Sequence, residues 1–482
     1  MLSMSQWGAA LVIDDQRRWA ARVIAIVVAF VAAATMLSVA QVPRAAAEPA
    51  PPADAFYDRP SDLASFAAGD IIRSRPVPVK AFQLFPIRVQ AWQLLYRTAD
   101  ANGAPDAAVT TVMIPEGPAK PRPLLSYQGA TDSTLRICNP SYGLVNGLPI
   151  DFSSPAGPIT LPVPAAEIAF AAGGLAEGWA VAMPDHGGID NRFLTPRQPG
   201  FAVLDGIRAA ENFGPLGLSG AATPTALWGY SGGAIASSLA VEEQPTYAPE
   251  LNIKGAAFGA PERDLEASLR SVNGALLGGL IPLALSAIGK DSPEFETELA
   301  KYLTPQGKAV IDETRNHCAS QNVLSNIWIR YENFLTAPID VVLANPVLRR
   351  EIDARGVTDR TPTAPVYVYN GVTEEVAPIV GTDKLVNGYC ARGAAVTYRR
   401  EELPPNPAPQ IFTTHGTVVA TGGPAAFKWL KERLAPGAPT PSGCDIRTVP
   451  STLLEPGVAA ELPPFVATAL SMIIGLPIGS GR

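Results

Sequence analysis

The sequence contains few charged residues and very little histidine. Only 17% of its 482 residues are Asp, Glu, Lys or Arg, whereas 47% are hydrophobic, and three are histidine. A chain of this composition can bury a large core, which argues against intrinsic disorder. With 37 basic against 44 acidic residues it lacks the basic excess that phosphate contacts require, so we expect no nucleic-acid partner. Only one segment approaches the length of a membrane span, which argues against a polytopic membrane protein.

Residues 1–47 have the pattern of an export signal. Arginines precede an apolar run at 23–40, and Ala45-Ala46-Ala47 supplies an A-x-A-like cleavage site, with a second candidate at Ser38-Val39-Ala40. We therefore predict a signal peptide and a secreted protein. The apolar run is long for a signal peptide, and an uncleaved segment would keep the protein associated with the cell envelope.

All four cysteines lie beyond the predicted signal, at Cys138, Cys318, Cys390 and Cys444. An even number of cysteines in an exported chain indicates two disulfides, for which three connectivities are open. The sequence has no C-x-x-C or H-x-x-x-H spacing, so we expect no metal site and no other cofactor.

Strand and helix signals alternate along the chain. Residues 89–100 and 107–115 flank Asn102-Gly103 and predict a β-hairpin. Short apolar segments then alternate with helical ones, which predicts an α/β fold with a mostly parallel sheet and helices on both faces. The predicted strands are 124–128, 180–184, 225–229, 253–258, 366–369 and 395–399, and the helices include 201–212, 233–244 and 424–434.

About a hundred residues before the strand at 366 interrupt this alternation with helical signals alone. We expect a core formed by 48–260 and 363–450, with 261–362 inserted as a helical cap or lid. An ordinary buried helical layer is the alternative. Residues 451–482 form a C-terminal apolar extension, which would pack on the body, close a pocket or touch lipid.

Gly229-Tyr230-Ser231-Gly232-Gly233 matches G-x-S-x-G between a predicted strand and a predicted helix. This arrangement places a serine hydroxyl on a sharp turn above a sheet, where small flanking residues allow close backbone approach. A turn packed against the sheet for structural reasons is the alternative. The context favours Ser231 as a nucleophile.

A serine nucleophile needs a base, and the scarcity of histidine restricts the choice. In α/β-hydrolases the order along the chain is nucleophile, acid, histidine. His186 precedes Ser231, among Pro, Asp and Gly residues that indicate a turn. His317 falls within the predicted cap. His415 follows the last predicted strand, on a loop just before a helix, which makes it the candidate base.

The acid is expected after the strand at 366–369, where Glu374 and Glu375 are adjacent and Asp383 is a third option. The two backbone donors for an oxyanion are expected at Gly232 and in the loop 129–134 after an early strand. The Asp-Ser-Thr run in that loop also fits a helix N-cap.

These residues together resemble the secretory lipases of the lipase A type, within the α/β-hydrolase superfamily. The resemblance covers roughly residues 80–445. Its motifs are Trp92-Gln93-Leu94-Leu95-Tyr96-Arg97, Tyr127-Gln128, Asp132-Ser133, Leu204-Asp205-Gly206-Ile207-Arg208-Ala209-Ala210, the serine motif, Glu375-Val376-Ala377-Pro378 and His415-Gly416.

The resemblance implies Ser231 as nucleophile, His415 as base, and oxyanion donors at the main chain of Asp132 and Gly232. It also implies a cap over an acyl-binding pocket. Relatives usually carry Asp before the Glu-Val-x-Pro run. Here that position is Glu374, which we therefore expect to be the acid, although its side chain is one methylene longer.

The resemblance further implies disulfides Cys138–Cys318 and Cys390–Cys444. The first would tie the oxyanion loop to the cap, and the second would brace the loops around His415.

We therefore expect a secreted serine carboxylester hydrolase, a lipase or esterase that works through an acyl-enzyme. The expected partner is a small-molecule or lipid ester, with transient contact to a lipid surface. An acyltransferase with the same triad is the main alternative, and a non-catalytic surface binding protein on a hydrolase scaffold is less favoured.

Overall fold

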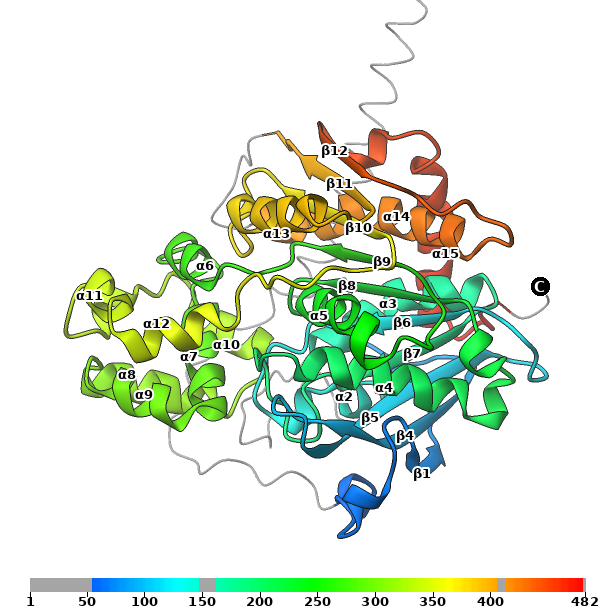
Figure 1. Ribbon diagram of the computed structural model, residues 1–482, viewed down its shortest axis with the longest axis horizontal. Coiled ribbons are helices and arrows are strands. Elements are labelled where there is room, and N and C mark those ends of the chain that lie inside the picture. The colour runs from blue at the N-terminus through cyan, green and yellow to red at the C-terminus, as the bar shows by residue number, and fades with distance from the viewer. Residues whose placement is uncertain (1–53, 147–161, 405–411, 480–482) are drawn as a thin grey trace, which may run out of the picture. The chain divides into compact units, whose positions relative to one another are not determined.

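The computed structural model describes residues 54–146, 162–404 and 412–479, and the predicted signal peptide lies outside them. A ten-stranded sheet organises these residues (Figure 1). In spatial order its strands are β1 (Ile71–Pro76), β4 (Val89–Ala99), β5 (Pro105–Pro115), β7 (Ala180–Pro184), β6 (Leu124–Gln128), β8 (Thr225–Tyr230), β9 (Ile253–Gly259), β10 (Val366–Gly371), β11 (Val396–Glu401) and β12 (Cys444–Val449). A separate two-stranded ribbon pairs β2 (Lys80–Ala81) with β3 (Phe85–Pro86).

The sheet is antiparallel at one side and parallel over the rest. β1, β4 and β5 pair antiparallel, and β5 meets β7 antiparallel. From β7 to β12 every pairing is parallel. The β4–β5 hairpin turns through Asn102-Gly103, where Gly103 takes a φ of 85° that glycine adopts without a Cβ clash. The predicted hairpin and the six predicted strands are present.

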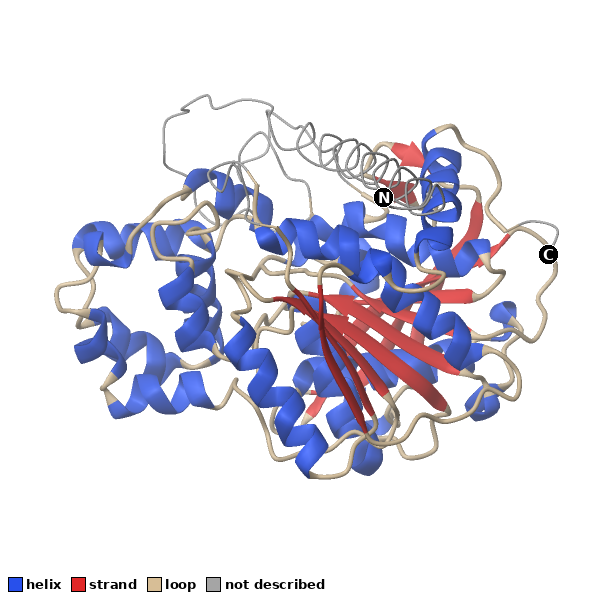
Figure 2. Cartoon of the chain, turned by 90° about the horizontal axis from the view of Figure 1, so that it is seen from above, coloured by secondary structure: helices blue, strands red, loops and turns tan. Residues whose placement is uncertain are grey.

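Helices cover both faces of the sheet (Figure 2). One apolar cluster joins Leu125 and Trp228 to α3 (Val163–Ala176) and α14 (Thr414–Leu434). A second cluster joins the alternate strand positions, such as Leu124 and Leu227, to α4 (Gln198–Glu211), α5 (Gly232–Tyr247) and α13 (Ile379–Ala391). Successive strand residues point to opposite faces, so such a strand contributes side chains to both clusters. The predicted α/β-hydrolase type of fold is confirmed.

Seven α-helices lie between β9 and β10 and gather at the left of Figure 1, beside the sheet. Their apolar cluster also takes in Ile235 and Leu239 of α5 and Val376 after β10. That these helices act as a cap remains a prediction. They are α6 (Leu265–Ser271), α7 (Leu280–Asp291), α8 (Pro293–Ala300), α9 (Pro305–Thr314), α10 (Ala319–Ser325), α11 (Ile339–Leu343) and α12 (Pro346–Asp353).

The helix that follows β11 begins earlier than predicted. The sequence indicated a helix from Pro424, but α14 begins at Thr414 and contains Pro424 in its interior. The Thr413 side chain accepts a hydrogen bond from Gly416 N at 2.9 Å and caps the helix. His415 therefore lies in the first turn of α14 and not on a loop.

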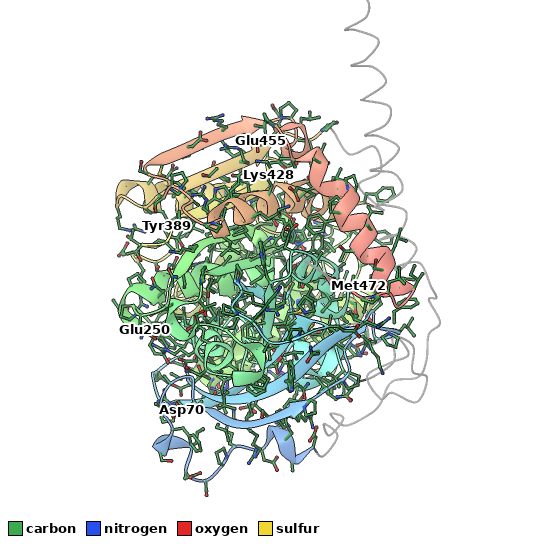
Figure 3. All side chains as sticks on the ribbon, turned by 90° about the vertical axis from the view of Figure 1, so that its right-hand side faces the viewer. Asp70, Glu250, Tyr389, Lys428, Glu455 and Met472 are labelled. Atoms are coloured by element: carbon green, nitrogen blue, oxygen red, sulfur yellow. A yellow bond between two sulfur atoms is a disulfide. The ribbon has the colours of Figure 1, made fainter. Side chains whose placement is uncertain are left out.

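The C-terminal extension forms α15 (Leu462–Ile473), which packs along α3. Phe465 meets the Phe427 ring at 4.9 Å, and Met472, labelled in Figure 3, is buried. Val466 and Leu470 remain about half exposed. Within residues 54–146, 162–404 and 412–479, no helix is both long enough and apolar enough to cross a membrane.

Candidate active site

Ser231 lies at the turn between β8 and α5. Its backbone has a φ of 53° and a ψ of −122°, outside the regions that a non-glycine residue usually occupies. The neighbouring strand fixes this turn, since Ser231 N donates to Gly259 O at 3.0 Å. The residue is 7% exposed. A strained serine between a parallel strand and a helix is the geometry that the G-x-S-x-G motif requires.

The glycines of the motif are required by contacts with the loop after β6. A Cβ on Gly233 would collide with the carbonyl oxygen of Gln128, and a Cβ on Gly232 would collide with Asp132 Oδ1. Asp132 itself has a φ of 38°. Glycine at these positions lets the loop approach the serine turn, so Asp132 and Gly232 lie side by side. That their N–H groups hold an oxyanion stays a prediction.

His415 is held by a buried glutamate. Its Nδ1 lies 2.5 Å from Glu374 Oε1, and the Glu374 side chain is completely buried. The other carboxylate oxygen of Glu374 accepts a hydrogen bond from Ala377 N. An ionised carboxylate only accepts hydrogen bonds, so Nδ1 carries the proton and Nε2 is the nitrogen with a lone pair. This is the tautomer that a general base beside a serine requires.

Two further contacts hold the His415 backbone. Glu375 Oε2 accepts from His415 N at 3.2 Å, and the Tyr230 hydroxyl donates to His415 O at 2.6 Å. The two adjacent glutamates therefore divide their contacts: Glu374 reaches the imidazole and Glu375 reaches the main chain. Tyr230, the residue before the serine, joins the serine turn to the histidine.

The other candidates lie elsewhere. Asp383 pairs with Arg400 at 3.0 Å and accepts from the Tyr398 hydroxyl at 3.0 Å. The ring of His186 contacts Gly129 O, and the carbonyl of His317 accepts from Ser133 Oγ at 3.0 Å. No hydrogen bond described for Asp383, His186 or His317 joins them to Glu374 or to the His415 ring.

Charge around the imidazole alters its titration. Burial alone would lower the pKa of His415, but the charge and hydrogen bond of Glu374, with Glu375 and Asp132, raise it overall. Burial raises the pKa of Asp132 to about 6 against the opposing effect of His415. Burial also raises the pKa of three further carboxyls to about 8: Glu167, Glu211 and Glu262.

Disulfides join Cys138 to Cys318 and Cys390 to Cys444. The first links the segment after the 129–134 loop to the start of α10, where Cys318 is the N-cap residue. The second joins the end of α13 to the start of β12, opposite Val396 in the parallel register. The second bridge therefore lies at the amino ends of these strands, so the expectation that it braces the loops around His415 is wrong.

Tyr230 and Glu167 contact the site but were not predicted from the sequence. Tyr230 occupies the variable position before the serine in G-x-S-x-G, and the motif assigns no role to that position. Glu167 is the one charged residue in the apolar segment of α3, and a single buried charge in such a helix is the signal that could have identified it. In the described ranges, no cluster of three or more His, Cys, Asp or Glu residues could hold a metal ion.

Comparison with known proteins finds lipases among the relatives of this chain. A family model described as secretory lipase matches residues 155–443. Lipase A of Arthroderma benhamiae is 32% identical over 91% of this chain and 91% of its own length. A Mycobacterium tuberculosis relative named as a probable inactive lipase is 34% identical over 88% of this chain and 91% of its own length.

Solved structures agree with the sequence relatives. The X-ray structure of Candida antarctica lipase A superposes with a TM-score of 0.69 at 26% identity, covering 85% of this chain and 94% of that one. The closed state of the same enzyme gives a TM-score of 0.70 at 25% identity, covering 88% and 98%. The chain belongs to the secretory lipase family and is a lipase-like hydrolase with the α/β-hydrolase fold.

Proposed function

We propose that the protein is a secreted serine carboxylester hydrolase in which Ser231, His415 and Glu374 form the triad. The oxyanion is held by the main-chain N–H groups of Asp132 and Gly232. The observation that carries this proposal is the buried Glu374 carboxylate 2.5 Å from His415 Nδ1, on the chain that also places Ser231 at a strained strand-to-helix turn.

The chemistry follows from these positions. His415 Nε2 takes the Ser231 proton as the hydroxyl attacks the ester carbonyl, and Glu374 stabilises the imidazolium that forms. The donors at Asp132 and Gly232 hold the tetrahedral oxyanion, and one such donor is worth about 2.7–4 kcal/mol of barrier. His415 returns the proton to the leaving alcohol. In the second half of the reaction, His415 takes a proton from water as the water attacks the acyl-enzyme, and it returns the proton to Ser231 as the acid leaves.

Apolar surroundings favour an ester with a hydrophobic acyl group. Ile235, one helical turn after Ser231, and Val376, two residues after Glu374, belong to the same apolar cluster as the inserted helices. Each buried methylene of a substrate contributes about 0.8 kcal/mol of binding. A long-chain ester should therefore gain in kcat/KM over acetate until the apolar space is filled.

Secretion and lipid contact also belong to the proposal. Two disulfides fit an oxidising compartment, and the family is described as secretory. The half-exposed Val466 and Leu470 on α15 fit transient contact with a lipid surface.

The test is hydrolysis of p-nitrophenyl esters of increasing acyl length by the unaltered protein and by Ser231→Ala. We expect loss of hydrolysis without loss of fold in the variant. Ser65→Ala, at an exposed serine, is the control and should match the unaltered protein. Retained hydrolysis in Ser231→Ala would reject the proposed nucleophile, and product analysis with added alcohol would reveal acyl transfer.

A non-catalytic role is the second candidate, favoured by the name of the Mycobacterium relative. The presence of Ser231 in the G-x-S-x-G turn and the contact between Glu374 and His415 support the hydrolase. Absence of hydrolysis across all acyl lengths by the folded, unaltered protein would favour the non-catalytic role instead.

A further inference from the structure

One peptide group in the loop before Asp132 is held at both of its polar atoms by buried, titratable side chains. The carbonyl of Gly129 lies 2.8 Å from His186 Nε2, and the N–H of Ala130 donates to Glu167 Oε2 at 2.7 Å. These two groups belong to the same peptide bond. Because a carbonyl only accepts, Nε2 of His186 carries the proton and donates.

The two side chains come from different parts of the fold. Glu167 lies on α3, and His186 lies in the turn after β7. The carbonyl and N–H of a trans peptide point in opposite directions, so contacts at both atoms fix the tilt of the peptide plane. Both side chains are less than 10% exposed, and their packing leaves them little freedom to move.

The loop is also closely packed around this peptide. A Cβ on Gly129 would lie 2.9 Å from Pro164 Cβ and 3.2 Å from Glu167 Oε2. On its amino side, Gln128 approaches Gly233 of the serine turn, and its side chain accepts from Ser237 Oγ at 2.7 Å. On its carboxyl side, Asp132 follows two residues later with its positive φ. The held peptide therefore lies between the serine turn and the proposed oxyanion donor.

We propose that Glu167 and His186 are positioning residues that fix the Gly129–Ala130 peptide and thereby aim the Asp132 N–H at the oxyanion. This inference rests on the proposed function, because the Asp132 donor belongs to it. A carboxyl buried in an apolar helix is costly, so its contact with the loop gives a reason for its presence.

Glu167 also has a characteristic titration. Burial raises its pKa to about 8, against the opposing hydrogen bond of Ala130, and the groups that face it are Asp132, Tyr127 and Tyr369. A neutral carboxyl still accepts from Ala130 N, but the ionised form places a negative charge behind the oxyanion. The kcat of the unaltered protein should therefore fall as pH rises through about 8.

The test compares Glu167→Gln, whose amide oxygen still accepts from Ala130 N, with Glu167→Leu, which removes the acceptor. The readouts are kcat and KM on p-nitrophenyl butyrate, the inhibition constant of an alkyl boronic acid that forms a tetrahedral adduct on serine, and the melting temperature. For Glu167→Leu we expect kcat to fall about 10- to 100-fold with KM nearly unchanged. The inhibition constant should rise by a similar factor.

Glu167→Gln should keep kcat at pH 7 and lose the decline near pH 8. His186→Phe, which fills the space but cannot donate to Gly129 O, should change kcat in the same direction as Glu167→Leu. Should Glu167→Leu fail to fold, Glu167→Asp replaces it, since the shorter carboxylate is withdrawn from Ala130 N and should lower kcat.

A lower melting temperature with unchanged kcat and boronate affinity in Glu167→Leu, or full kcat in Glu167→Asp, would overturn the inference. The unaltered protein separates this failure from that of the proposed function. If it hydrolyses the ester and binds the boronic acid, only the positioning role is rejected. If it does neither, the hydrolase assignment fails first.

Discussion

Replacing Glu374 by glutamine should disable the histidine far more than the same change at Glu375. Glu374 uses both of its oxygens as acceptors, one toward His415 Nδ1 and one toward Ala377 N. Glutamine has one acceptor oxygen and one NH2 donor. With its oxygen kept toward Ala377, its NH2 would face Nδ1 and select the tautomer that cannot accept the serine proton.

The size of the effect follows from that conflict. Loss of the buried acid of a serine triad through the wrong tautomer costs roughly 10³- to 10⁴-fold in kcat, or about 4–5.4 kcal/mol. Glu375 accepts from backbone N–H groups, that of His415 at 3.2 Å and its own, and a glutamine oxygen can do the same. The Glu375→Gln variant should therefore lose less than about tenfold, the cost of weakening one hydrogen bond.

The assay is steady-state hydrolysis of a soluble p-nitrophenyl ester from pH 5 to 9, with circular dichroism to confirm folding. His415 must be neutral to act, so activity rises with pH through its pKa. Glu374 raises that pKa, so the acidic limb should move to lower pH in Glu374→Gln. Equal activity in the two variants, or greater damage from Glu375→Gln, would refute the assignment of Glu374.

Three further outcomes are expected. Gly232→Ala should lower kcat roughly 100-fold, because its Cβ would displace Asp132. Gly214→Ala is the control and should leave kcat unchanged, because a Cβ there meets nothing within 4 Å. Equal kcat in the two variants would contradict this prediction. The buried carboxyls with pKa values near 8 are protonated more readily in the folded than in the unfolded chain, so stability should fall as pH rises from about 4.5 to 8. A melting temperature at pH 8 equal to or above that at pH 5 would count against it. Replacing both Cys138 and Cys318 by serine should lower kcat and should also lower the free energy of unfolding by about 2–4 kcal/mol. Replacing Cys390 and Cys444 should lower the free energy of unfolding alone. Thermal melts and steady-state kinetics on both variants check this.

The sheet was predictable because its strands are short apolar runs with clear boundaries. The strands from β6 to β10 are largely buried on both faces, so their sequences are nearly continuous apolar runs. The observed limits of the strands from β6 to β11 differ from the predicted ones by at most two residues. The predicted start of α14 at Pro424 was ten residues too late, because the Thr413 side chain caps a helix that begins at Thr414. β12 was missed because its mostly exposed residues give no apolar run.

Some residues of the candidate site could likewise be predicted from the sequence and others could not. Ser231 and His415 were identifiable from a motif and from the scarcity of histidine, and the structure brings His415 together with Glu374. Residue type alone left Glu374 and Glu375 as alternatives, because the two residues are adjacent and chemically identical, and only the family resemblance favoured Glu374. Only the backbone path decides which carboxylate reaches the ring. Glu167 was missed because its partner is a main-chain N–H, and no sequence pattern records such a contact.

Covalent labelling tests whether Ser231 is an activated nucleophile. The folded protein should react with an alkyl fluorophosphonate to give a single mass adduct, which peptide mapping assigns to Ser231. His415→Ala should slow this reaction strongly because it removes the base. An unlabelled folded protein, or an adduct on a different serine, would show that Ser231 is not the activated nucleophile.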